Sequence, residues 1–496
     1  MPIFLLAIWE LIYIGLILTV KKKWFNLPLQ YKLNKHKLLL LFAPALFYLL
    51  IPLMQYYRFS ELYLASFVFL NVYLYFIIFE DYRALASWCG VIAIFIIGIL
   101  NLDKAFGVEI IEQEVLWKGV NWNVIGIFTG TMIVADLFMK SKVPELLAEI
   151  FIARASTVGL AIIIVSAFSG LISAVCENVA TVLIVAPIAF KIAKRLKVSP
   201  APFLIAIAIA SNLEGAATLI GDPPSIILAA NTNMTFNEFF WFLGRPSLFF
   251  AVQLGAVGGI YVLYLLFKKY KQPVEKIEKT EIISWIPTYL LGLLTLGLAL
   301  LSIFNLGFEI TGGPLCMVIA VGGLIWWKFK ISIKGTIRKI IREFDFETVF
   351  LLMGIFILVA GLSHSGVIVN VAKFLSQQAG NNFLLTFIFL TLMSMIFSAF
   401  IDNVPYVTAM IPISLTMALE MGLSLPQTYA LAYAIAIGAS IGGNITPIGA
   451  SANIVAVGLL KKEGYRTSFI EFVKIGLPFT LVATLIASVF IILFWH

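Results

Sequence analysis

The feature that most constrains this chain is a succession of apolar runs, each long enough to cross the bilayer core of about 30 Å as an α-helix. They lie near residues 3–20, 39–55, 61–79, 83–102, 122–139, 201–231, 246–267, 285–304, 314–329, 346–364, 427–460 and 472–494. Hydrophobic residues make up 61% and charged residues 12% of the chain, which excludes a soluble protein with a polar surface. The sequence therefore predicts an all-α polytopic membrane protein. The first run lacks the flanks of a signal peptide, so we expect it to be retained.

Two further apolar runs, at 156–190 and 382–418, have a polar break near the middle. The breaks are Glu177-Asn178 in CENVATVLIVAP and Asp402-Asn403 in IDNVPYVTAMIP, which are altered copies of one motif. A carboxylate at hydrocarbon depth costs about 2.5–3.5 kcal/mol and usually lines a polar site. We predict two re-entrant hairpins that turn at mid-depth. The alternative for each run is a pair of ordinary spans joined by a tight turn.

The similarity between the two halves extends beyond the hairpins. WNVIGIFTG at 122–130 resembles FETVFLLMG at 346–354. The number of residues that separates these two segments is nearly the same as the number that separates the two hairpin motifs. We divide the chain into two additional N-terminal spans (1–60), repeat 1 (61–267), a polar cytoplasmic linker (268–284) and repeat 2 (285–496). Each repeat has about five spans, one hairpin and one broken helix, and this odd number of crossings gives two inverted repeats, as is typical of secondary transporters.

Two Gly- and Pro-rich stretches, inside 201–231 and 427–460, are expected to break their helices. SNLEGAATLIGDPPSII and SIGGNITPIGASANIV align at Gly215/Gly443, Thr218/Thr446 and Gly221/Gly449. Because consecutive Pro with nearby Gly cannot continue a helix, each stretch predicts an unwound segment in mid-membrane. Its carbonyls and half-helix ends would then be available to a solute. Packing glycines and kinks in ordinary spans are the alternative.

Basic residues gather in alternate loops, as the positive-inside rule requires of a correctly counted layout. This distribution predicts a plasma (inner) membrane protein with both termini outside. The first hairpin would enter from the cytoplasm and the second from outside. The topology also accounts for the formal net charge of +8, so no nucleic-acid partner is needed. KFKISIKGTIRKIIREF at 328–344 is expected to form a basic interfacial helix.

The motifs SAVCENVATVLIVAP, SNLEGAATLIGDPP, SAFIDNVPYVTAMIP and GGNITPIGASANIV resemble the hairpin and broken-helix signatures of the ion transporter superfamily. Within it, the chain is similar to the ArsB/NhaD/P protein group, which contains arsenite permeases and Na⁺/H⁺ antiporters with a citrate transporter-like domain. The resemblance covers roughly residues 60–494. It implies a scaffold domain, a moving transport domain, elevator-type alternating access and often a homodimer.

The predicted binding site collects the polar residues of the hairpin tips and broken helices. Its candidate residues are Glu177, Asn178, Asn212, Glu214, Thr218, Gly221, Asp222, Pro223, Asp402, Asn403, Gly443, Asn444, Thr446, Gly449, Ser451 and Asn453. A candidate Na⁺ position lies at Glu177, Asn178, Asp402 and Asn403. Glu214 departs from the family pattern, and this extra carboxylate is either a ligand or a charge that reaches water in the cavity. N-capping of the following half-helices is the structural alternative for the two hairpin-tip carboxylates.

The site is rich in carboxylates, and no Lys or Arg is expected at the same depth, so it should repel a bare polyanion. Acidic tips suit a site that binds a cation or takes up protons. The leading hypothesis is a proton-coupled antiporter that exports Na⁺ or a neutral metalloid hydroxide such as arsenite, without a cofactor. The alternative is a sodium-driven importer of a carboxylate or another anion. No HExxH, CxxC, Walker loop or Ser/His/Asp grouping occurs, which argues against an enzyme.

Overall fold

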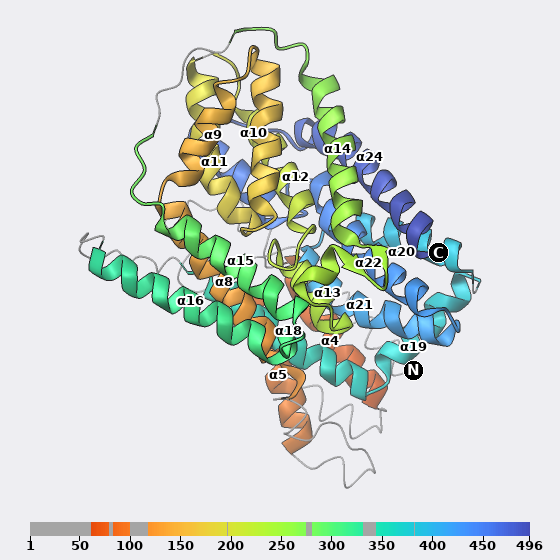
Figure 1. The fold of residues 1–496 in the computed structure, drawn as a ribbon. Helices are drawn as coiled ribbons and strands as arrows, with labels where there is room; N and C mark the ends of the chain where they lie inside the picture. The colour runs from red at the N-terminus through yellow and green to blue at the C-terminus, as the bar shows by residue number, and fades with distance from the viewer. Residues whose placement is uncertain are drawn as a thin grey trace, which may run out of the picture. The chain divides into compact units, whose positions relative to one another are not determined.

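The computed structural model describes residues 61–78, 83–99, 118–195, 197–273, 280–330, 344–380 and 382–496 (Figure 1). The chain divides into two units, Met1–Leu64 and Ala65–His496, and the description below concerns the second. The two additional spans predicted within 1–60 and most of the interfacial helix predicted at 328–344 lie outside the described residues.

The first half of the described chain is helical apart from one short hairpin of strands. Its elements are α4 (Glu61–Ile78), α5 (Arg83–Ile99), α8 (Trp122–Lys140), α9 (Val143–Ile152), α10 (Val158–Ser173), α11 (Asn178–Arg195), α12 (Ala201–Gly215), α13 (Pro223–Thr232), η3 (Phe236–Phe239), β1 (Trp241–Phe242), β2 (Arg245–Pro246) and α14 (Leu248–Phe267). β1 and β2 pair antiparallel over two residues each, so the described residues are predominantly helical, in agreement with the predicted class. The turn contains Leu243 and Gly244, both in the left-handed backbone region that tight hairpins require.

The second half repeats this order of helices. Its elements are α15 (Ile286–Ile303), α16 (Phe308–Lys330), α18 (Phe346–His364), α19 (Val367–Gln378), α20 (Phe383–Ser398), α21 (Asn403–Glu420), α22 (Leu425–Gly442), η4 (Gly443–Ile445), α23 (Ser451–Lys462) and α24 (Phe469–Trp495). α9 and α19 occupy stretches between the predicted spans and hairpins, where no helix is expected from the sequence. They are too short to cross a bilayer, so a search for long apolar runs overlooks them.

Helix starts follow from side chains that bind free backbone N–H groups. Asn121 Oδ1 accepts from the backbone N–H of Val124 at 3.1 Å and so caps the start of α8. Asp345 Oδ1 accepts from the backbone N–H of Thr348 at 3.0 Å and caps the start of α18 in the same way. These two helices begin at equivalent places in the predicted repeats, and both are capped in the same way.

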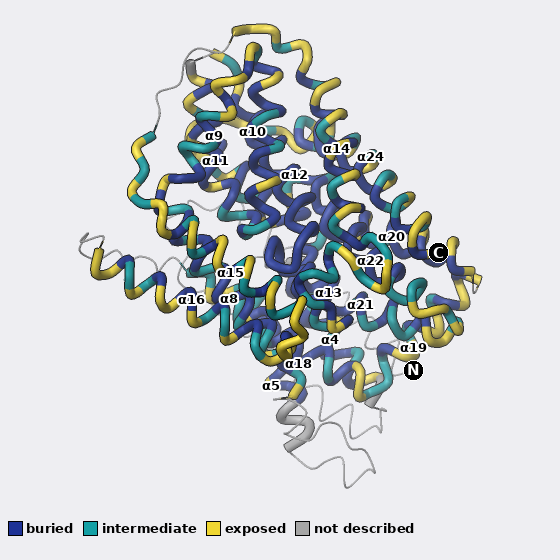
Figure 2. Tube along the Cα trace, in the orientation of Figure 1, coloured by how far each residue is buried: buried dark blue, intermediate teal, exposed yellow. Residues whose placement is uncertain are grey.

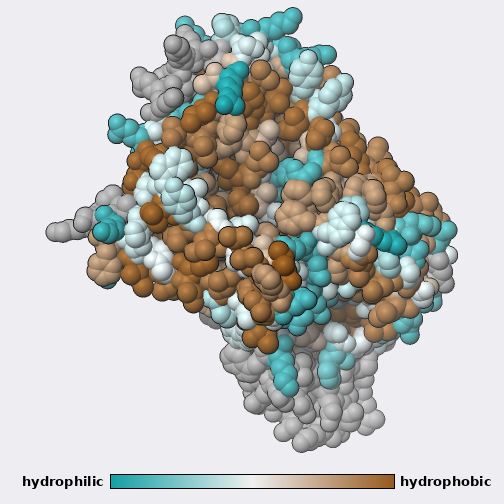
Figure 3. Space-filling view, viewed as in Figure 1, coloured by the Kyte–Doolittle hydropathy of each residue, from teal (hydrophilic) through white to brown (hydrophobic). Residues whose placement is uncertain are grey.

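Seven described helices are long and apolar enough to cross a membrane, or eight if the bent pair α19 and α20 is taken as one span. They differ in how much of their surface the protein covers. The spans of α15 and α16 are 28% and 39% buried, whereas the span that contains α22 is 83% buried. Figure 2 shows this contrast between an exposed edge and a buried centre. The visible face in Figure 3 is largely apolar around α15 and α16, as a lipid-facing surface would be.

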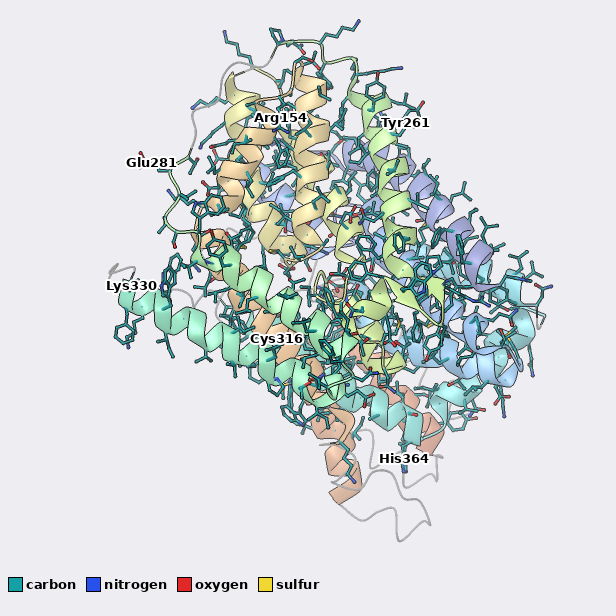
Figure 4. The ribbon with its side chains drawn as sticks, in the orientation of Figure 1. Arg154, Tyr261, Glu281, Cys316, Lys330 and His364 are labelled. Carbon is teal, nitrogen blue, oxygen red and sulfur yellow. The ribbon has the colours of Figure 1, made fainter. Side chains whose placement is uncertain are left out.

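Close packing between α8 and α16 depends on small residues. A Cβ on Gly130 would lie 2.6 Å from that of Cys316, and one on Gly126 would lie 2.8 Å from the Cα of Gly313. Asn123 joins the same two helices, because its Oδ1 accepts from the Gly313 N–H at 2.6 Å. Cys316 therefore faces α8 as a packing residue (Figure 4).

Candidate functional site

The two hairpins each consist of two helices that meet at a short break. α10 ends at Ser173 and α11 begins at Asn178, while α20 ends at Ser398 and α21 begins at Asn403. The hairpin-tip carboxylates stand immediately before the second helix of each pair. Glu177 Oε2 accepts from the Ala180 N–H at 2.9 Å, and Asp402 Oδ1 accepts from the Val404 N–H at 3.0 Å. Both carboxylates therefore cap a helix, as the structural alternative expected.

Each broken helix is unwound between its two halves. α12 ends at Gly215, and α13 begins only at Pro223, where two consecutive prolines occupy the first turn. Asp222 caps α13 through the Ser225 N–H at 3.1 Å. In the second copy, η4 follows α22, and α23 starts after Ala450, which has no polar side chain to cap it. The α23 N-terminus thus keeps free N–H groups.

Equivalent contacts hold the two unwound segments against the two hairpins. Thr218 Oγ1 donates to the Ala174 carbonyl, and Thr446 Oγ1 donates to the Ala399 carbonyl. Gly221 and Gly449 lie so close to the hairpin backbones that an added Cβ would stand 2.9 Å from the Ser173 carbonyl oxygen or 2.7 Å from that of Ser398, respectively. These contacts fix the position of each unwound segment against its hairpin.

Three asparagines connect the two broken helices. Asn212 Nδ2 donates to Asn444 Oδ1 at 2.8 Å and to Asn453 Oδ1 at 2.9 Å. Both acceptors are oriented by their own donated bonds, from Asn444 to the Ile209 carbonyl and from Asn453 to the carbonyls of Gly443 and Thr446. Since both Nδ2 hydrogens of Asn212 are used, its orientation is determined by this network. Its Oδ1 is buried and accepts no hydrogen bond from any described residue.

One cavity, of about 80 Å³, brings both hairpin tips and both broken helices together. It is lined by Arg83, Phe128, Glu177, Asn178, Val179, Asn212, Pro223, Asp345, Thr348, Leu351, Asp402, Asn403, Val404, Ala450, Ser451 and Ala452. Seven of the sixteen predicted site residues are among them: Glu177, Asn178, Asn212, Pro223, Asp402, Asn403 and Ser451. A larger space of about 600 Å³, lined in part by Asn121, Asn231 and Glu309, contains none of the predicted site residues.

Arg83 is the main residue that the sequence analysis missed. The alternation of basic residues between loops predicts a cytoplasmic loop position for Arg83, but it begins α5, and its Nη1 lies 2.7 Å from Asp402 Oδ2. The side chains of Arg83 and Asp402 are 12% and 5% exposed. The expectation that no Lys or Arg lies beside the carboxylates was therefore wrong. Its position at the start of an apolar run was the available signal, since a basic residue there can reach into a polar site as well as into a loop.

Asp345 was also missed, because it follows the basic stretch that is expected to form an interfacial helix. It lines the cavity from the N-cap position of α18, and its two carboxylate oxygens accept from the N–H and the hydroxyl of Thr348. The opposite end of α18 carries His364, which is exposed and does not line the cavity (Figure 4).

Glu214 and Asp222 lie apart from the cavity lining. Glu214 is buried and accepts from Gln253 Nε2 of α14 at 2.5 Å. Asp222 lines a much smaller space of about 10 Å³, which shares Phe128 and Glu177 with the cavity. Its Oδ2 is buried without a hydrogen bond from any described residue.

Comparisons with known proteins agree with a helical membrane transporter. A family model described as Citrate transporter matches residues 73–436 and 317–496. An uncharacterized transporter of Mycobacterium tuberculosis is 32% identical over 380 residues, covering 75% of this chain and 86% of the relative. The P protein of Mus musculus is 25% identical over 498 residues, covering 84% of this chain and 58% of the P protein. The YdaH transporter of Alcanivorax borkumensis has a similar fold, with a TM-score of 0.53 and 15% identity over 76% of this chain and 86% of that chain.

The family match covers most of the chain, and the similar proteins are transporters rather than enzymes. The apolar helices of the described residues agree with a multi-pass membrane location. The P protein, which the sequence motifs pointed to, is among the relatives. This chain is a multi-pass membrane transporter that belongs to the citrate transporter (CitMHS) family.

Proposed function

We propose that this transporter is a proton-coupled antiporter that exports a small solute, either Na⁺ or a neutral metalloid hydroxide such as arsenite. The observation that carries the proposal is that two lining residues carry acceptor groups, the Glu177 carboxylate and the Asn212 amide, whose Oδ1 accepts no hydrogen bond from any described residue. Glu177 makes no ion pair within the described part of the chain. A buried acceptor without a donor, such as Asn212 Oδ1, is costly, and so is a carboxylate charge without a counter-ion, so a cation, a proton or a hydroxyl-bearing solute would stabilise the site.

The volume of the cavity also favours a small solute. A water molecule takes about 30 Å³ in the liquid, so a cavity of about 80 Å³ accommodates a few waters, a partly hydrated ion or a trihydroxide. Sites for drug-sized ligands occupy about 300–1,000 Å³. In this conformation the site is too small for an extended tricarboxylate.

In the proposed mechanism, Glu177 and Asp402 exchange protons for the transported solute. The amides of Asn178, Asn212 and Asn403 orient the solute, while Ser451 supplies a hydroxyl at the edge of the cavity. Arg83 and Asp345 belong to parts of the chain that the predicted topology, based on the distribution of basic residues, assigns to the cytoplasmic side. We therefore propose that this conformation is open toward the cytoplasm.

Two inverted repeats and elevator-type movement are part of the same proposal. Its support is the set of matched contacts in the two copies, from the capped starts of α8 and α18 to the threonine bonds at both hairpins. The hairpins and broken helices would form the moving transport domain, and a homodimer would hold the scaffold still.

A second candidate is a sodium-driven importer of a carboxylate. Arg83 and the uncapped N-terminus of α23 favour it, because both attract anions. The description of the family as citrate transporters points the same way. Against it, Asp402 already neutralises Arg83, and two further carboxylates line the cavity.

The test is proton flux in proteoliposomes that contain a pH-sensitive dye, with Na⁺, Li⁺, K⁺ or arsenite added in turn. Glu177→Gln should lower the flux caused by the true substrate at least about tenfold, equivalent to about 1.4 kcal/mol. Glu309→Gln, an exposed carboxylate outside the cavity, is the matched control and should behave as the wild type.

A pH change caused by one solute and lost in Glu177→Gln supports antiport and names the substrate. If no solute changes the pH, the antiporter proposal fails. Uptake of labelled citrate that requires external Na⁺ would then establish the second candidate.

A further inference from the structure

The ion pair between Arg83 and Asp402 makes the two hairpin tips chemically different. Of the described ion pairs, it alone involves residues that line the cavity. Glu177, at the other tip, has no such partner among the described residues. The other charged residues that line the same cavity are Glu177 and Asp345.

Most of the acceptor capacity of Asp402 is in use while Arg83 is in place. Its Oδ1 accepts from the Val404 N–H, and its Oδ2 accepts from Arg83 and, at 3.2 Å, from Ser451 Oγ. A metal cation at this carboxylate would also stand next to the guanidinium charge, which repels it. Arg83 and a bound cation therefore compete for Asp402.

The pair is built from a single hydrogen bond. Arg83 donates through Nη1, and its Nε is buried without a partner among the described residues. Arginine and carboxylate usually form two parallel bonds, which hold the pair more firmly. An end-on pair that leaves another donor unsatisfied is easier to exchange for a different cation.

The same contact links two parts of the fold. Arg83 begins α5, which packs along α18, whereas Asp402 begins α21 of the second hairpin. Close by, the Tyr73 hydroxyl of α4 donates to the Pro405 carbonyl of α21. The side chains of α4 and α5 therefore hold this hairpin tip at two neighbouring points.

We propose that Arg83 is a tethered counter-ion of Asp402, which a small monovalent cation must displace before the hairpin tip can leave α4 and α5. This inference rests on the proposed cation-coupled function and adds the residue that determines when Asp402 is available. It predicts that removal of Arg83 creates a cation site at Asp402 that the wild type lacks in this conformation.

The experiment measures the melting temperature of the full-length protein in detergent, with NaCl replacing choline chloride at constant ionic strength. Arg83→Ala should gain Na⁺-dependent stability, because Na⁺ binds the bare carboxylate in the folded state only. We expect Na⁺ to raise its melting temperature by at least about 3 °C more than that of the wild type.

Three variants isolate the cause. Arg83→Ala/Asp402→Asn lacks the carboxylate and should lose the extra Na⁺ effect. Arg83→Lys keeps the tethered charge and should respond to Na⁺ like the wild type. Arg245→Ala removes an arginine that binds the Phe494 carbonyl outside the cavity, so it should also respond like the wild type. If Arg83→Ala does not fold, Arg83→Gln takes its place in the same comparison.

Equal Na⁺ effects in the wild type, the single variant and the double variant would overturn the proposal. A failure of the proposed transport function looks different. In that case wild-type proteoliposomes show no solute-driven pH change, although the single variant still gains its Na⁺-dependent stability.

Discussion

Asn212 shows, at the scale of one residue, how a polar side chain can be both structural and functional. Its two donated bonds join α12 to the second broken helix, the residue lines the cavity, and its Oδ1 is buried without a partner among the described residues. An amide achieves this because it carries two donors and one acceptor group on a single rigid plane. The binding group is therefore oriented before a solute arrives.

We predict that Asn212→Leu lowers the free energy of unfolding by about 2–4 kcal/mol, because it leaves two buried amide oxygens without donors. The measurement is reversible unfolding in detergent by denaturant. Asn231→Ala is the control: it removes a single bond to the Ile227 carbonyl within one helix and should cost about 1 kcal/mol. Equal losses of unfolding free energy in both variants would show that the bonds between the broken helices stabilise the protein no more than a single bond within one helix.

At the scale of elements, glycine allows the unwound segments to touch the hairpin backbones. Gly449 lies against the carbonyl oxygens of Gly443 and Ser398, where an added Cβ would stand at 2.6 Å and 2.7 Å. Because these neighbours are backbone atoms, they cannot move aside as a flexible side chain would. The contact between a hairpin and a broken helix thus requires the absence of a side chain at this position.

Gly449→Ala should therefore destabilise the protein by about 1–3 kcal/mol, through overpacking. Gly458→Ala is the matched control, since Gly458 lies inside α23 with open space around its missing Cβ. That change should be neutral or stabilising by up to about 1 kcal/mol, because alanine favours a helix. Thermal unfolding of both variants in the same detergent measures the difference, and a neutral Gly449→Ala would contradict the close contact.

At the scale of the whole molecule, the distribution of basic residues predicts which loops face the cytoplasm. A chain with three cysteines can be tested by single-cysteine labelling in a cysteine-free variant. A membrane-impermeant maleimide should label Lys373→Cys in intact cells, and should label Lys271→Cys only after the membrane is opened. Both positions are exposed. The reverse pattern would invert the proposed topology and place the cavity on the outer side.

Features of this protein that depend on neighbouring residues could be predicted from the sequence. Helix α18 runs over Phe346–His364, the range predicted from its apolar run, and both hairpins break at Glu177-Asn178 and Asp402-Asn403. Apolar length, proline and capping side chains act within a few positions, so they can be read without the fold.

Which polar groups meet depends on the three-dimensional packing of the helices. Arg83 and Asp402 are 319 positions apart, and Asn212 and Asn444 are 232 apart. Glu214 belongs to the same motif as Asn212 but bonds to Gln253 of α14 instead of lining the cavity. Local patterns cannot distinguish such neighbours, because the direction of a side chain depends on which helices pack around its own. The helices and their breaks thus follow from local sequence, whereas the charge balance of the cavity follows from long-range packing.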